Sequence, residues 1–129
     1  MPVLRQIMGK KPSAPKGRVR NYIANKHLGT AQTDIHENTI NPGVTVPWHL
    51  HATEEIIVVL EGQGEYLTEG QSEPYKGGDV LIIPARVKHA LRNTGDRQIR
   101  QICVFPDDPK TERLEPEYPG QSVEVFNER

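Results

Sequence analysis

The sequence predicts a single all-β domain, a sandwich or barrel built from many short strands. Its 129 residues are enough for one domain with one core. The chain contains 11 glycines and 11 prolines, a turn-rich composition that favours short strands over long helices. Short apolar runs alternate with turn signals, and we find no convincing amphipathic helix and no internal repeat.

The expected strands are β-branched or apolar runs bounded by turn residues. The strongest is 55–60 (EIIVVL), after which a turn at 61–64 leads into 65–68. A second turn at 76–79 leads into 80–83, and a proline-containing loop at 84–88 precedes the next run. We expect strands over 19–24, 33–40, 55–60, 65–68, 80–83, 89–92 and 98–105, with 123–126 as a last short strand or a packed tail.

The composition of the chain divides it into three parts. Residues 1–18 are basic and contain three prolines, which predicts a mobile N-terminal arm or an extended strand that docks elsewhere. Residues 19–106 hold the strands of the predicted barrel. Residues 107–129 are polar and proline-rich, and we expect this tail to pack on or near the barrel.

Charge and cysteine content narrow the classes of function. The net charge is −1, from 16 basic and 17 acidic residues. The chain therefore lacks the excess of basic residues that is typical of proteins that bind nucleic acid or an anionic membrane. A single cysteine, Cys103, makes neither a disulfide framework nor a thiolate zinc cluster. The sequence has no apolar run typical of a signal peptide or a transmembrane span, so we expect a cytoplasmic protein.

The segment PWHLHATEEI carries the strongest chemical signal. If it is extended, His49, His51 and Glu55 share one face of a strand and Glu54 points to the other. Apolar residues continue the first face, so burying these polar groups there requires a partner. A divalent transition metal is a suitable one, since imidazole and carboxylate ligands bind Fe, Mn, Ni, Cu or Zn. His89, at the start of a later strand, is available as a fourth ligand.

Two motifs in this chain resemble those of the cupins. The first spans residues 43–62, as Gly43-x5-His49-x-His51-x3-Glu55-x6-Gly62, and the second spans residues 78–93, as Gly78-x5-Pro84-x-Arg86-x2-His89-x3-Asn93. The resemblance implies a small single-domain jelly-roll β-barrel in which His49, His51, Glu55 and His89 bind one metal. It departs from the family at Arg86, where glycine is usual. Arginine there implies backbone strain of about 1–3 kcal/mol, or a loop that does not need the glycine conformation.

Three further residues are candidates for the pocket. His36 lies in a strand expected beside the first motif, where it is available as an acid–base group or as a partner of a metal ligand. Tyr66 is placed to donate a proton or a hydrogen bond. The planar guanidinium of Arg86 suits a carboxylate or phosphate at the mouth of the barrel.

The resemblance leaves the reaction open, because one fold supports many chemistries. We expect a metal-dependent enzyme, first of all a dioxygenase or another oxidoreductase acting on a small substrate that chelates the metal. An isomerase, epimerase or lyase that works by proton transfer is the second possibility, and a non-catalytic small-molecule or metal-binding protein is the third. Since the edge strands of a jelly roll need covering, we also expect a homodimer.

Overall fold

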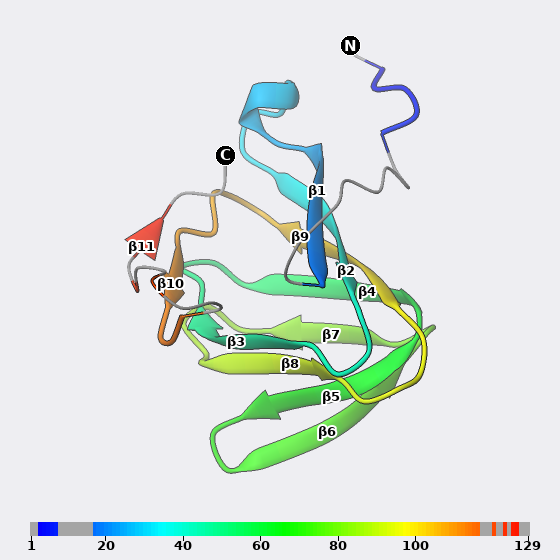
Figure 1. Cartoon of the computed structure of the whole chain (residues 1–129). Coiled ribbons are helices and arrows are strands. Elements are labelled where there is room, and N and C mark those ends of the chain that lie inside the picture. Colours follow the sequence, from blue (N-terminus) through cyan, green and yellow to red (C-terminus); the bar gives the residue numbers. More distant parts are fainter. Residues whose placement is uncertain (1–2, 8–16, 117–119, 121–122, 124, 127–129) are drawn as a thin grey trace.

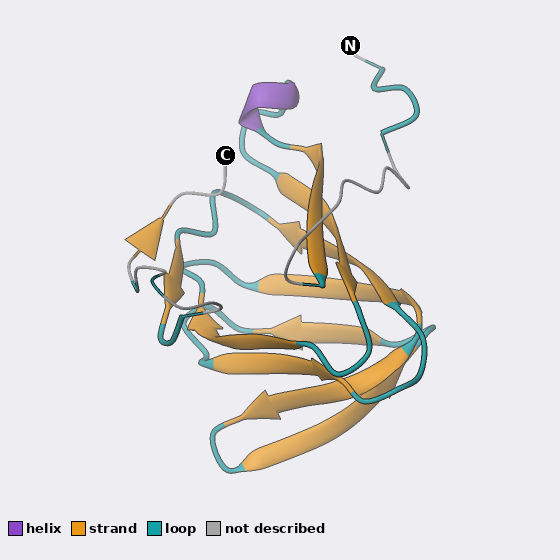
Figure 2. Cartoon of the chain, in the orientation of Figure 1, coloured by secondary structure: helices purple, strands orange, loops and turns teal. Residues whose placement is uncertain are grey.

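The computed structural model describes residues 3–7, 17–116, 120, 123 and 125–126, and within them the chain is almost entirely β-strand (Figures 1 and 2). One short 3-10 helix is present and no α-helix occurs among these residues. No helix in this part of the chain is long and apolar enough to cross a membrane. The elements are β1 (Arg18–Ala24), η1 (Lys26–Leu28), β2 (Asp34–Ile40), β3 (Thr45–Leu50), β4 (Glu55–Glu61), β5 (Gln63–Thr68), β6 (Gln71–Lys76), β7 (Val80–Ile83), β8 (His89–Asn93), β9 (Ile99–Phe105), β10 (Thr111–Arg113) and β11 (Val125–Phe126).

The strands form two antiparallel sheets, which confirms the predicted all-β fold. The five-stranded sheet has the order β1-β2-β9-β4-β7, and the six-stranded sheet has the order β11-β10-β3-β8-β5-β6. The chain crosses between the sheets repeatedly, so that β3 and β4, which are consecutive, belong to different sheets. The two motifs of the sequence are therefore distributed over both sheets.

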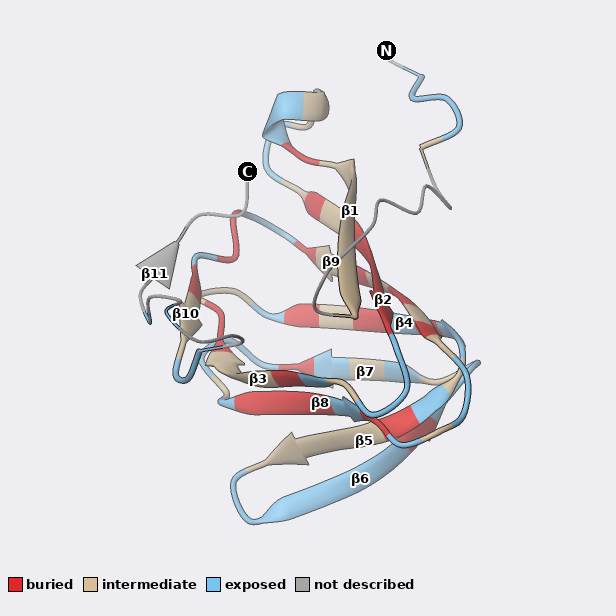
Figure 3. Ribbon diagram, viewed as in Figure 1, coloured by how far each residue is buried: buried red, intermediate tan, exposed pale blue. Residues whose placement is uncertain are grey.

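The core lies between the two sheets, and the alternation of side chains explains it. Along β9, buried and half-buried residues alternate strictly, as expected for a strand with one face inside. Figure 3 shows buried segments on β2, β4, β8 and β9, whereas β6 is largely exposed. The apolar core contains Ile40, Val46, Ile57, Val59, Tyr75, Ile83, Leu91, Ile99, Cys103 and Phe105.

The structure contains strands that the sequence patterns did not indicate. β6 and β10 were not expected, and β5 begins at Gln63, so Gly62 alone separates it from β4. β1 begins at Arg18, within the segment expected as an arm. Residues 1–2 and 8–16 of that segment lie outside the described residues. β10, within the expected tail, pairs with β3 through Glu112 and Arg113.

Candidate metal centre

Three histidines and one glutamate converge from both sheets. His49 lies near the end of β3, His51 follows that strand directly, Glu55 is the first residue of β4 and His89 is the first residue of β8. His49 and His89 are direct cross-strand neighbours in the β3–β8 pair. One possible ligand atom from each of the four residues lies within 4.8 Å of the others.

The expectation that His49, His51 and Glu55 share one continuous strand is wrong. β3 ends at Leu50, and β4 begins at Glu55 in the opposite sheet. The turn between them carries the chain across the barrel, so the carboxylate faces the imidazoles from the other side. The grouping itself agrees with the structure, because the three side chains meet and Glu54 is exposed.

Each imidazole is held by its Nδ1 atom. His49 Nδ1 lies 2.6 Å from the carbonyl oxygen of Pro47, and His89 Nδ1 lies 2.8 Å from that of Val87. A carbonyl only accepts hydrogen bonds, so both Nδ1 atoms carry the proton and donate it. In the neutral rings the lone pair is therefore on Nε2. His51 Nδ1 lies 2.8 Å from the hydroxyl oxygen of Thr111, which positions this ring in the same way.

The atoms that face one another inside the group lack hydrogen-bond partners. His51 Nε2, His89 Nε2 and Glu55 Oε1 are all buried and make no hydrogen bond. The carboxylate oxygen lies 3.3 Å from His51 Nε2 and 3.4 Å from His89 Nε2. Buried polar atoms without partners are costly, and a cation among them would be coordinated by all of them at once. The four residues His49, His51, Glu55 and His89 therefore form a group able to bind a metal ion, the metal group of this chain.

Electrostatics within the group favour the forms of these side chains that bind a cation. Burial is the largest influence on Glu55 and opposes its ionisation, but the imidazoles of His51 and His89 outweigh it and hold the carboxyl pKa well below its usual range. Burial, together with the neighbouring His89 and His51, lowers the pKa of His49 well below its usual value. An ionised carboxylate beside a neutral imidazole is what metal coordination requires.

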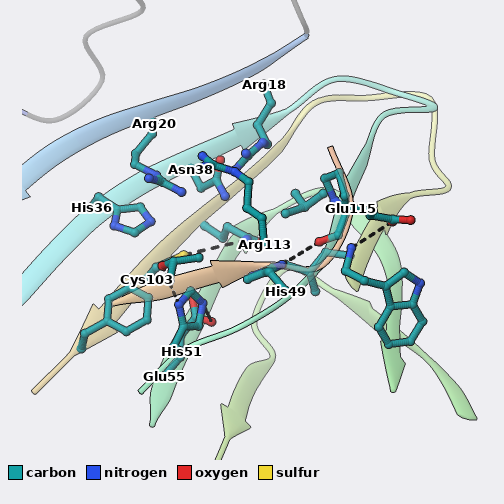
Figure 4. A pocket seen from close by; sticks show the side chains of 17 residues that line it. Arg18, Arg20, His36, Asn38, His49, His51, Glu55, Cys103, Arg113 and Glu115 are labelled. Carbon is teal, nitrogen blue, oxygen red and sulfur yellow. Dashed lines mark hydrogen bonds and ion pairs between the residues drawn. The ribbon is translucent and has the colours of Figure 1, made fainter. Parts of the chain in front are cut away.

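A pocket opens beside His49, His51 and Glu55, between the two sheets (Figure 4). β2 and β9 supply one wall, and β1 and β10 bring positively charged side chains to it. Besides His49, His51 and Glu55, the lining comprises Arg18, Arg20, His36, Asn38, Val46, Pro47, Trp48, Leu91, Gln101, Cys103, Phe105, Thr111, Arg113 and Glu115.

Of the three further candidates, only His36 lines this pocket. It is 3% exposed, and its Nδ1 atom lies 3.4 Å from Asp34 Oδ1. Tyr66 is partly buried, with its ring centre 6.2 Å from that of His89, and burial raises the pKa of its hydroxyl. Arg86 is exposed on the loop before β8, where its backbone N–H donates to the His51 carbonyl at 2.8 Å. Neither Tyr66 nor Arg86 is among the residues that line the pocket.

Sequence reasoning missed several lining residues. Arg18 fell within the expected arm, although Arg18 and Arg20 alternate in β1, as residues on one face of a strand do. Trp48 also lines the pocket, although it is out of phase with His49 and His51 in the sequence. The register of β3 shifts between Val46 and His49, and such irregularities change where side chains point. Nothing in the local sequence pattern identified Arg113.

Comparison with known proteins identifies a family. The chain matches the family model "Cupin domain" over residues 36–105. It is 33% identical over 122 residues to auxin-binding protein T85 of Nicotiana tabacum, covering 84% of this chain and 65% of that protein. It is 40% identical over 65 residues to a 5-nitrosalicylic acid 1,2-dioxygenase of Bradyrhizobium sp, covering 50% of this chain and 31% of that protein. The chain thus spans less than two thirds of the length of either relative.

A solved structure of similar shape supports the fold. A cupin-like protein from Thermotoga maritima superimposes with a TM-score of 0.69 at 23% identity, covering 83% of this chain and 86% of that chain. At this identity the likeness concerns the fold alone, and it confirms the jelly-roll barrel that the two motifs imply.

Proposed function

Because the chain belongs to the cupin family, whose domain model it matches over residues 36–105, we propose that it is a metal-dependent enzyme acting on a small molecule. His49, His51, Glu55 and His89 hold the metal, and the substrate offers it a carbonyl, enol or carboxylate oxygen. Oxidation by dioxygen, as in a dioxygenase, is the reaction that we favour. Relatives that carry this name include the 5-nitrosalicylic acid 1,2-dioxygenase and an acireductone dioxygenase of Saccharomyces cerevisiae, 31% identical over 84 residues.

The observation that carries this proposal is the set of buried Nε2 and carboxylate atoms without hydrogen-bond partners at the edge of a pocket. A bound iron, manganese or copper ion supplies Lewis acidity and dioxygen activation there. The chain contributes three fixed imidazoles, whose Nδ1 hydrogen bonds keep the rings from rotating. It also contributes a pocket in which Val46, Leu91 and Phe105 limit the access of water to the substrate.

His36 and Asp34 support a second candidate, an isomerase, epimerase or lyase that works by proton transfer. Both side chains are almost fully buried, and His36 faces the pocket with Phe105 stacked at 5.7 Å between ring centres. A carboxylate next to an imidazole orients the ring and stabilises its protonated form. His36 then serves as the acid or base toward a substrate bound beside His51. The auxin-binding relatives favour the third possibility, a binding protein without turnover.

We also propose a cytoplasmic homodimer. The outer face of the five-stranded sheet carries exposed apolar side chains, with Val80 54% and Ile82 68% exposed on the edge strand β7. Their cross-strand neighbours Val58 and Ile56 continue this apolar surface on β4. A second copy that stacks its equivalent face there covers both surfaces at once. A monomer in light scattering would contradict the dimer.

The metal content of untagged protein, measured by mass spectrometry, tests the proposed function. We expect close to one ion of Fe, Mn, Ni, Cu or Zn per chain, because the four ligands surround one point. His49→Ala and His89→Ala each remove a ligand and are expected to lose the ion. His27→Ala is the matched control, since His27 is exposed in η1 and is not part of the group.

The identity of the metal then selects the assay. Iron, manganese or copper leads to measurement of oxygen uptake with small chelating substrates, and zinc or nickel leads to isomerase and lyase screens. If no stoichiometric metal is found, even after reconstitution with each of the five ions, the proposed enzyme is excluded.

A further inference from the structure

Two buried amide side chains, those of Asn38 and Gln101, line the pocket from neighbouring strands. Asn38 lies on β2 (Figure 4) and Gln101 lies on β9, and the two residues are direct partners in the antiparallel register. The next inward-facing positions on these strands hold Ile40 and Ile99, which belong to the apolar core. Amide groups at such positions are costly unless each has a hydrogen-bond partner.

Gln101 has its partners within the protein. Its Oε1 atom accepts a hydrogen bond from the Tyr75 hydroxyl at 3.5 Å, and its Nε2 atom donates to Cys103 Sγ at 3.9 Å. Tyr75 is 3% exposed, so this amide supplies the acceptor that a buried hydroxyl needs. The core itself therefore explains why position 101 is polar.

Asn38 has no such explanation. It is 4% exposed, and its Oδ1 atom is buried without a hydrogen-bond partner. The arginines that line the same pocket have interactions of their own, so the unmet requirement on this wall is the amide oxygen. An amide oxygen only accepts hydrogen bonds, and its missing partner is therefore a donor. A ligand that brings a hydroxyl group to this place would supply it.

The strand register places Asn38 away from the metal group. Asn38, Gln101 and Val59 are successive partners across β2, β9 and β4, so they form one row of the sheet. Glu55 lies two inward-facing positions before Val59 on β4, which corresponds to about 14 Å of strand. Because Glu55 and Asn38 line the same pocket, a ligand that binds the metal at one end meets Asn38 with its other end.

We propose that Asn38 is a specificity-determining residue, and that it selects ligands carrying a hydroxyl group at the end remote from the metal. The amide oxygen accepts a hydrogen bond from this hydroxyl. The inference rests on the proposed function, because it names the class of small molecule that the same pocket receives.

Isothermal titration with matched pairs of probes tests the inference. The probes are ω-hydroxyalkanohydroxamates with chains of three to six carbons, each paired with the hydroxamate in which a methyl group replaces the hydroxyl. The hydroxamate end binds the metal, and the full-length protein is loaded with zinc, which has no redox chemistry. We expect the hydroxyl member to bind at least tenfold more tightly at one chain length or more, since its methyl counterpart leaves the amide oxygen unpaired.

Variants assign this preference to Asn38. In Asn38→Leu the preference for the hydroxyl member is expected to be lost or reversed, because leucine has similar branching but no acceptor. Asn38→Asp keeps an acceptor oxygen and is expected to keep the preference. Circular dichroism and the zinc content of each variant establish that the fold and the metal group are intact.

Thermal unfolding of the metal-free protein without ligand gives a second readout. Asn38→Leu is expected to raise Tm by roughly 3 °C, because it replaces an amide without a partner by an apolar side chain beside the core. Gln101→Leu is the matched control from the same row of the sheet. It is expected to lower Tm, since the buried Tyr75 hydroxyl then loses its acceptor.

The outcomes separate this inference from the proposed function. If zinc is bound but no probe binds, if the members of every pair bind equally, or if Asn38→Leu keeps the preference, the inference is overturned and the enzyme proposal stands. If the protein takes up no metal, the enzyme proposal fails and the Tm comparison alone decides the role of Asn38. A gain in Asn38→Leu with a loss in Gln101→Leu then supports a ligand-facing amide, and the absence of a gain in Asn38→Leu overturns it.

Discussion

Arg86 shows how a single residue departs from the usual motif without disturbing the metal group. Its φ angle is 66°, so the loop does adopt the left-handed conformation that normally favours glycine. The backbone N–H of Arg86 donates to the carbonyl oxygen of His51 at 2.8 Å. This hydrogen bond ties the loop before β8 to a metal-group residue and gives a reason for the conformation.

Replacing Arg86 by glycine is therefore expected to stabilise the fold. Removing the side chain from the left-handed region relieves about 1–2 kcal/mol of strain, and the greater freedom of glycine in the unfolded chain costs about 0.5–1 kcal/mol. We expect the free energy of unfolding to rise by up to about 1.5 kcal/mol, measured by urea denaturation of the metal-free protein.

Arg86→Ala is the control for this change, because alanine removes the guanidinium but keeps the Cβ atom that causes the strain. It is expected to bring no gain in stability. Equal stabilisation by Arg86→Ala and Arg86→Gly would place the effect in the charge of the side chain and contradict the strain argument.

At the scale of elements, the short strand β10 has a role that its length does not suggest. It comprises only Thr111–Arg113, but it pairs with β3 beside the metal group. Thr111 is 3% exposed, and its hydroxyl oxygen lies 2.8 Å from His51 Nδ1. A segment that follows the main barrel strands thus fixes the orientation of one imidazole.

Removing the Thr111 hydroxyl is expected to weaken metal binding. In Thr111→Val the His51 ring loses the hydrogen bond at Nδ1, and loss of such a partner typically lowers metal affinity about 10–100-fold. Thr111→Ser keeps the hydroxyl and is expected to retain most of the affinity. Competition with a chromophoric zinc chelator measures the zinc affinity of both variants. Unchanged affinity in Thr111→Val would mean that packing alone orients His51.

β4 was predictable from its local sequence, whereas β6 and β10 were not. The run 55–60 was predicted as a strand because β-branched apolar residues identify it locally, and it is β4 in the structure. β10 has the sequence TER and β6 has the sequence QSEPYK, which carry no such signal. They become strands because neighbouring strands offer them hydrogen bonds, a tertiary effect that local patterns do not contain.

The same distinction applies to the site. His49, His51, Glu55 and His89 were grouped from spacing and family resemblance, and the structure brings them within 4.8 Å. The arginine side of the pocket was missed because it depends on which strands become neighbours. Arg113 approaches His49 only through the β3–β10 pairing, and Arg20 approaches Asn38 only through the β1–β2 pairing.

At the scale of the whole molecule, the metal group connects the two sheets. His49 and His89 belong to strands of the six-stranded sheet, and Glu55 belongs to β4 in the five-stranded sheet. Without an ion, the meeting point of the sheets contains buried polar atoms that lack partners. An ion bound there joins the sheets and removes this unfavourable feature of the core.

Metal removal is therefore expected to destabilise the whole barrel. With free metal at 100 times its dissociation constant, binding contributes about 2.7 kcal/mol to the folded state. For a domain of this size, 1 kcal/mol corresponds to roughly 3–5 °C, so we expect chelation to lower Tm by about 10 °C and metal addition to restore it. Differential scanning calorimetry at fixed protein and metal concentrations measures the change.

Hydrogen exchange distinguishes a link between sheets from a local effect. If the ion joins the sheets, its removal speeds exchange in β4 as well as in β3 and β8, because both sides of the barrel lose the same support. His89→Ala is the control, since without this ligand neither Tm nor exchange is expected to respond to metal. Faster exchange confined to β3 and β8 would show that Glu55 does not share the ion, and the metal group would then belong to one sheet only.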